Sequence, residues 1–240
     1  WTDYINSTDR TIRGARVSPG GAVLDSPPVP VSLITSNRRP SLAWSGVVHM
    51  AAWYSGSSFY YVARSDSQGN LLDSPPIQIG SDSAGTQPFI AWTGSEFLVV
   101  MGSSYRSITA AGVPVQGAPV ALGVTPQAMS CAGTSCAFTT YSNGALRLTP
   151  FNASTKTLGS STPIFTGPGR PSSVVWDGQK FLVVHGTDDC RSSETPISWN
   201  REGQRGPAGA DGSDGAQGAD GAVGPQGERG PAGADGVDGT

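Results

Sequence analysis

Short apolar runs closed by Gly, Pro, Asp or Ser recur through residues 10–186 and predict β-strands. The pattern is clear at Val174–Trp176, where Asp177-Gly178 leads into Lys180–His185. Asp-Gly between two β-rich runs favours a hairpin, because its tight turn needs positive φ. The second run is apolar at successive positions, which is typical of a strand covered on both faces. No segment shows a helical period with caps, so the pattern predicts an all-β fold.

The predicted hairpins belong to a longer internal repeat. Residues 14–28 recur at 62–76, and residues 40–46 recur at 88–94, both with a shift of 48; further copies lie at 171–178 and, more weakly, at 126–133. Four short strands per unit of 40–48 residues are typical of a β-propeller blade. A stack of hairpins in a sandwich or solenoid is the alternative. We predict propeller-like repeats of four-stranded units, incomplete in this chain.

The repeats also resemble a known family. Residues 14–25 read Gly-Ala-Arg-Val-Ser-Pro-Gly-Gly-Ala-Val-Leu-Asp, and residues 176–184 contain Trp-Asp-Gly followed by Phe-Leu-Val-Val. Together they resemble the propeller-like repeats of secreted and surface proteins of myxobacteria and related bacteria, over residues 10–186. The resemblance implies an extracellular β-propeller and implies no particular activity.

The repeat begins and ends within a unit. Three full units are expected near 36–83, 84–122 and 123–167, with a half-unit on each side. Trp1 aligns with Trp53 and Met101, late in a second strand. Either upstream units precede this sequence, or the C-terminal half-unit pairs with the N-terminal half to close a ring. We favour the first interpretation.

Residues 203–240 differ in kind from the head at residues 1–200. Glycine occupies every third position without a break: Gly203, Gly206, Gly209, Gly212, Gly215, Gly218, Gly221, Gly224, Gly227, Gly230, Gly233, Gly236 and Gly239. Only glycine fits at the axis of a collagen triple helix, so the phase predicts a collagen-like tail and a homotrimer. A disordered tail remains the alternative. Pro207, Pro225 and Pro231 all occupy the X position of the Gly-X-Y triplet and no proline occupies Y, which predicts a weak triple helix.

Charge and hydropathy exclude some partners. The tail has six acids against two arginines, a net charge of −4, so the rest of a chain of net charge −3 carries +1. A nearly neutral head offers no basic field for nucleic acid. No apolar run approaches 18 residues, so no membrane-spanning segment is predicted.

Two cysteines replace the aromatic pair of the hairpin in one unit. Cys131 stands at the tryptophan position and Cys136 at the phenylalanine position, and these positions face each other across the turn. A disulfide is therefore predicted, which favours an oxidising compartment; two buried free thiols are the alternative. Cys190 is left over, and its partner is unknown.

The sequence offers no catalytic, cofactor-binding or metal-binding residue. His49 and His185 occupy strand positions and are interpreted as packing residues. Asp25 and Asp73 recur in a Leu-Asp-Ser-Pro-Pro turn, where a turn or capping role explains them. No nucleophile, zinc or phosphate-loop motif is present, so we predict no cofactor and no enzyme.

These observations together predict a secreted or cell-surface binding or structural protein. A propeller head on a collagen-like trimerising stalk is typical of an adhesive or matrix-associated role. Its ligand, an extracellular protein or glycan, is unknown. The alternative is a carbohydrate-acting propeller enzyme whose catalytic residues are not identifiable here.

Overall fold

The computed structural model describes residues 2–4, 10–32, 37–56, 58–83, 85–167, 172–185 and 221–230. Its contacts divide the chain into two compact units: Trp1–Ser192, which contains all described residues of the head, and Ser193–Thr240, which contains the tail. The described residues contain β-strands and no helix, which confirms the predicted all-β class. Trp1, Cys190 and nine of the thirteen tail glycines lie outside the described residues.

The strands form five antiparallel sheets that follow one another along the chain. Sheet 1 contains β1 (Thr2–Tyr4), β2 (Arg10–Gly14) and β3 (Val29–Ser32). Sheet 2 contains β4 (Asn37–Trp44), β5 (His49–Ser55), β6 (Phe59–Ser65) and β7 (Ile77–Ser81). Sheet 3 contains β8 (Phe89–Trp92), β9 (Phe97–Met101), β10 (Ser104–Ile108) and β11 (Val120–Ala121).

Sheet 4 contains β12 (Ala128–Ala132), β13 (Ser135–Ser142), β14 (Ala145–Asn152), β15 (Thr157–Leu158) and β16 (Thr162–Thr166), and both β15 and β16 pair with β14. Sheet 5 contains β17 (Ser172–Trp176) and β18 (Phe181–His185). Sheets 2, 3 and 4 therefore correspond to the three predicted full units. Sheet 1 matches the last strands of a unit and sheet 5 its first two.

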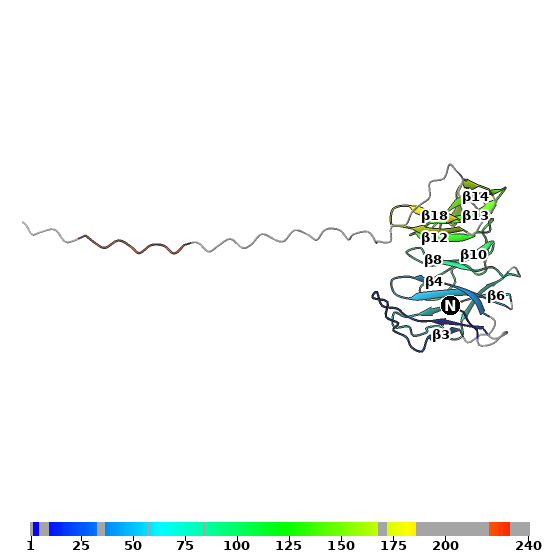
Figure 1. Ribbon diagram of the computed structural model, residues 1–240, viewed down its shortest axis with the longest axis horizontal. Helices are drawn as coiled ribbons and strands as arrows, with labels where there is room; N and C mark the ends of the chain where they lie inside the picture. The colour runs from blue at the N-terminus through cyan, green and yellow to red at the C-terminus, as the bar shows by residue number, and fades with distance from the viewer. Residues whose placement is uncertain are drawn as a thin grey trace, which may run out of the picture. The chain divides into compact units, whose positions relative to one another are not determined.

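From sheet 2 to sheet 5, the first strand of each sheet lies beside the first strand of the next. β4 contacts β8, β8 contacts β12, and β12 contacts β17. Figure 1 shows the sheets following in chain order from β3 to β18. The repeat therefore places equivalent strands side by side across the head.

The hairpin between the first two strands is built the same way in three sheets. Gly46, Gly94 and Gly178 have φ values of 92°, 94° and 101°, the region that favours glycine. The residue before each glycine caps the turn: the hydroxyls of Ser45 and Thr93 each donate to the carbonyl three residues on, and Asp177 Oδ1 accepts from Lys180 N. The predicted Asp-Gly turn is thus confirmed.

The largest core cluster fills the space between sheets 2 and 3. Fully buried side chains from both sheets meet there, among them Met50, Tyr60, Ile79, Phe97 and Ile108. All five residues of β9 are buried, as expected for a strand covered on both faces. Apolar burial between sheets therefore drives their association.

The described part of the tail, residues 221–230, has no regular hydrogen-bonded structure, and its residues are exposed. Figure 1 draws it as an extended trace. Within the chain, no atom lies within 4 Å of the positions that Cβ atoms would take at Gly221, Gly224, Gly227 and Gly230. The single chain thus gives these glycines no packing role of its own.

Candidate functional site

A repeated arginine–aspartate pair closes the long turn between β2 and β3 in sheet 1 and between β6 and β7 in sheet 2. Arg16 Nη2 lies 2.7 Å from Asp25 Oδ1, and Arg64 Nη2 lies 2.8 Å from Asp73 Oδ1. The same carboxylates accept from the backbone, at 2.7 Å from Arg16 N and 2.8 Å from Arg64 N. The predicted turn role of both aspartates is therefore only part of their function.

Each arginine also reaches the next sheet. Arg16 Nη1 donates to Ser67 O at 3.4 Å, and Arg64 Nη1 donates to Ala110 O at 3.0 Å. The two acceptor residues occupy equivalent turns in sheets 2 and 3. In each turn a glycine of positive φ, Gly69 or Gly112, follows two residues after the acceptor. We call this set of contacts an arginine bridge: an arginine, the aspartate that it pairs with, and the turn of the following sheet that accepts its hydrogen bond.

The two glycines leave room for the arginine bridges. A Cβ atom at Gly69 would lie 3.3 Å from Arg16 Nε, and one at Gly112 would lie 2.7 Å from Arg64 Nε. Both residues also have φ values, 87° and 84°, that strain other residues. Close approach and backbone geometry therefore both require glycine here.

The first pair is electrostatically complementary although it is solvent-accessible. The pKa of Asp25 is lowered, mainly by the side-chain hydrogen bonds that Arg16 donates and next by the hydrogen bond from the Arg16 backbone. The same side-chain hydrogen bonds raise the pKa of Arg16. The hydrogen bond with Asp73 likewise raises the pKa of Arg64. The lowered pKa of Asp25 and the raised pKa of Arg16 thus keep this first pair ionised over the neutral range.

The junction between sheets 3 and 4 uses different residues in the same geometry. Ser107 takes the place of Arg64, and Ser107 N donates to Gln116 Oε1 at 2.7 Å, where Arg64 N donates to Asp73. Lys156 has a φ of 60°. It lies three residues before Gly159, whose backbone N–H closes the turn of sheet 4, just as Gly112 lies three residues before Val115, whose backbone N–H closes the turn of sheet 3. The glycine position of the bridge is therefore occupied by a lysine.

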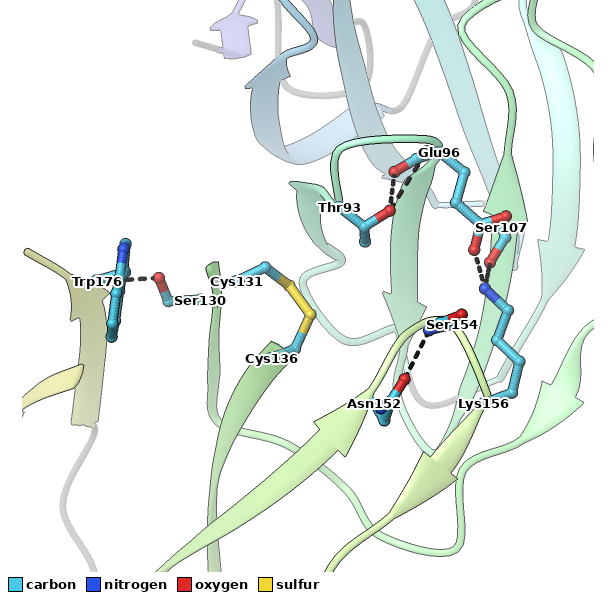
Figure 2. The surroundings of a disulfide bond; sticks show 10 residues. All are labelled: Thr93, Glu96, Ser107, Ser130, Cys131, Cys136, Asn152, Ser154, Lys156 and Trp176. Atoms are coloured by element: carbon cyan, nitrogen blue, oxygen red, sulfur yellow. Dashed lines mark hydrogen bonds and ion pairs between the residues drawn. A yellow bond between two sulfur atoms is a disulfide. The ribbon is translucent and has the colours of Figure 1, made fainter. Parts of the chain in front are cut away.

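Lys156 provides at this junction the positive charge that Ser107 lacks. Its Nζ donates to Ser107 Oγ at 3.0 Å and forms an ion pair with Glu96 of sheet 3, as Figure 2 shows. The side chains of Lys156 and Glu96 are 24% and 14% exposed, and burial lowers the pKa of Lys156. The cation thus comes from the following sheet rather than from the preceding one.

Cys131 and Cys136 form a disulfide across the hairpin of sheet 4, in the predicted pairing. They are directly paired in the β12–β13 register, with Cα atoms 4.0 Å apart. The equivalent rings of Trp92 and Phe97 have centroids 4.8 Å apart, and those of Trp176 and Phe181 4.9 Å. The disulfide therefore replaces an aromatic contact between the same two strands.

Replacing both Cys131 and Cys136 with alanine is expected to lower the free energy of unfolding by about 2 kcal/mol, because the bond closes only a short loop. Substituting Trp and Phe at the two positions is expected to recover part of the loss by restoring the ring contact of the sibling sheets. Urea denaturation under oxidising conditions measures both effects. A double-alanine chain as stable as the parent would contradict a stabilising disulfide.

A cleft of about 530 Å³ lies between sheets 1 and 2. Its walls are mostly apolar, and Arg16 and Asp25 are among the residues that line it. The lining also includes Gly14, Val29, Val31, Leu42, His49, Ala51 and Ser65. This volume lies within the range of small-molecule sites, but the lining gives no nucleophile paired with a base.

Other titratable residues form no reactive cluster in the part of the chain that the structure describes. The ring of His49 lies against that of Trp44, tilted by 38° with centroids 4.2 Å apart, and the ring centroids of His185 and Phe165 are 4.4 Å apart, so both histidines make packing contacts. Among the described residues no group of three His, Cys, Asp or Glu side chains is placed to hold a metal ion. Nor do they include a helix long and apolar enough to cross a membrane.

Comparison with known proteins identifies no family for this chain. No family model matches the chain, and no curated protein matches it. Hydrazine synthase of Kuenenia stuttgartiensis is similar in structure with a TM-score of 0.49 and 14% identity over 72% of this chain and 49% of that chain. A chain of a nidogen/laminin complex has a TM-score of 0.49 and 12% identity, over 74% of this chain and 68% of its own.

A third structure, apo AztD of Citrobacter koseri, has a TM-score of 0.41 and 10% identity over 73% of this chain and 50% of that chain. The chain therefore spans about half the length of the hydrazine synthase and AztD chains that it matches.

Proposed function

We propose that this chain is an extracellular or cell-surface binding or structural protein, in which a β-propeller-like head is presented in three copies by a collagen-like stalk. The observation that carries the proposal is the strict phase of glycine at thirteen consecutive third positions from Gly203 to Gly239. A flexible linker explains a glycine-rich composition but not this phase.

In this proposal the head has a binding or structural role. Its five consecutive antiparallel sheets, with first strands side by side, fit a propeller-like arrangement. The residues that recur from sheet to sheet, such as Arg64 and Asp73, are engaged in holding sheets together. Three heads on one stalk raise the effective affinity for a repeated ligand on a matrix or cell surface.

The disulfide supports an extracellular location, because such bonds persist in oxidising compartments.

The low proline content of the tail sets the conditions for the test. Since no proline occupies the Y position, the triple helix should be most populated in the cold.

The test is the solution mass of the full chain at low temperature, measured by sedimentation equilibrium. We expect a trimer of the 24.6 kDa chain. Changing Gly221, Gly224 and Gly227 together to alanine is expected to give monomers, because each Cβ blocks the triple-helix axis. The matched control changes Ala222→Ser and Gln226→Ala, at X and Y positions, and should stay trimeric.

Two results would contradict the stalk. One is a monomeric parent chain in the cold, and the other is a trimer that survives the three glycine substitutions. Circular dichroism of the tail region gives an independent reading, since a triple helix melts cooperatively while a flexible linker does not.

A further inference from the structure

Arg106 of β10 lies in the junction between sheets 2 and 3. Its guanidinium group donates to Ile79 O of sheet 2 at 3.1 Å, to Gln116 O at 2.9 and 3.0 Å, and to Gly117 O at 2.8 Å. Ile79 is the extra residue of a β-bulge in β7. Three backbone carbonyls from two neighbouring sheets therefore surround one guanidinium group.

The repeat places the same three backbone positions at the junction between sheets 1 and 2. The residues that match the three acceptors are, in the same order, Val31, Asp73 and Ser74. Val31 is also the extra residue of a β-bulge, in β3. The Asp73 side chain accepts a backbone hydrogen bond in its turn, as that of Gln116 does. The two junctions thus offer equivalent sets of carbonyls.

The residue that differs is the one that supplies the guanidinium group. Ala63 matches Arg106, because the two directly precede Arg64 and Ser107, which occupy equivalent places. Ala63 also faces the preceding sheet, where it packs in one cluster with Ile12. Among the described residues, no side chain donates to the three matching carbonyls of this junction.

A cavity of about 400 Å³ lies at these carbonyls. All three matching residues line it, and Pro30, Leu71, Pro75 and Pro76 give it apolar walls. Such walls suit the aliphatic stem of an arginine, and the carbonyls suit its planar head of five N–H donors. The Asp73 carboxylate is already paired with Arg64, so the carbonyls are the acceptors that remain for a ligand.

The cavity is open because of Ala63, which belongs to the four-stranded sheet 2. The order β4-β5-β6-β7 places the first two strands of a sheet on one side of the third strand and the fourth strand on the other. Strands that precede β2 would therefore add beside β1, away from β3, which lines the cavity. At the next junction, where sheet 2 contributes all four strands, the Arg106 side chain and not a strand meets the carbonyls.

We propose that this cavity binds an alkylguanidinium group, carried by an arginine side chain of a partner protein or by a free guanidino compound. The ligand takes the place that Arg106 has at the next junction. Its guanidinium donates to the carbonyls of Val31, Asp73 and Ser74, and its stem lies against Leu71 and the prolines. The inference gives the head a ligand class and rests on its proposed binding role.

The test is an NMR titration of the full chain with acetyl-Gly-Arg-Gly-amide and, separately, with agmatine. The amide signals of Val31, Asp73 and Ser74 are expected to shift with a dissociation constant of about 1 mM or below. Tighter binding of the peptide indicates a partner protein as the source, and equal or tighter binding of agmatine indicates a free compound. The matching citrulline peptide, which has a similar shape without the charge, is expected to bind at least about tenfold more weakly.

Two alanine-to-arginine variants locate the site. Ala63→Arg is expected to weaken binding at least about tenfold, because its own guanidinium reaches the carbonyls as that of Arg106 does. Ala121→Arg, at an exposed position of β11, adds the same charge and should leave the affinity unchanged. Arg106→Ala is expected to create a second site, seen as ligand-dependent shifts of the Ile79 and Gly117 amides.

Four results would overturn the proposal. They are unshifted amides at up to about 10 mM peptide, a citrulline peptide that binds as tightly, undiminished binding by a folded Ala63→Arg chain, and no second site in Arg106→Ala. None of them bears on the trimeric stalk, which is judged from the solution mass. A monomeric chain would likewise leave this titration unchanged, so the two proposals fail separately.

Discussion

Gly112→Ala is expected to lower the free energy of unfolding of the head by about 3 kcal/mol. Part of the loss is the strain of an alanine at φ of 84°. The rest arises because the new Cβ would lie 2.7 Å from Arg64 Nε and 2.9 Å from its Cζ. Arg64 would have to move from Asp73, a side chain only 8% exposed.

Gly94→Ala is the matched control for that substitution. Gly94 has a similar φ of 94°, and no atom lies within 4 Å of its Cβ position, so its alanine variant carries the strain alone. Urea denaturation of both variants should show the Gly112 variant less stable by about 2 kcal/mol. Equal losses would mean that the arginine bridge contributes nothing to the junction of sheets 2 and 3.

Lys156→Met is expected to cost about 2 kcal/mol, because it leaves the partly buried Glu96 carboxylate without its cation. The loss stays below that of a fully buried pair, since the two side chains are 24% and 14% exposed. The other lysine of the chain, Lys180, is exposed in a hairpin turn, and Lys180→Met should change stability by less than about 0.5 kcal/mol.

A double-mutant cycle with Glu96→Gln separates the pair from its surroundings. If Lys156 and Glu96 stabilise each other, the double variant should lose at least about 1 kcal/mol less than the sum of the single losses. Additive losses would show that the two residues act independently, and would remove the ion pair as the link between sheets 3 and 4.

The strands and hairpins were predictable because their signals are local. Asp177-Gly178 between two apolar runs fixes a turn from a few neighbouring residues, and the register then places Cys131 opposite Cys136. The recurrence of Arg16 and Asp25 as Arg64 and Asp73, always nine residues apart, was also visible and would have indicated the ion pair. We predicted only a turn role for the aspartates.

Contacts between sheets could not be predicted from the sequence, because they depend on how separate repeat units pack against one another. Lys156 and Ser107 are 49 residues apart, and neither belongs to a motif. Their proximity follows from the stacking of sheets 3 and 4, which no single repeat encodes. The cleft was equally hidden, because it lies where sheets 1 and 2 meet.

The arginine bridge also restricts how units of this kind can be recombined. A unit that carries Arg64 must be followed by one with glycine at the Gly112 position, whereas a unit with Ser107 and Glu96 accepts one with Lys156. Exchanging sheets 3 and 4 in a shuffled gene would set the ammonium group of Lys156 against the guanidinium of Arg64. The order of units along the gene is therefore itself under physical constraint.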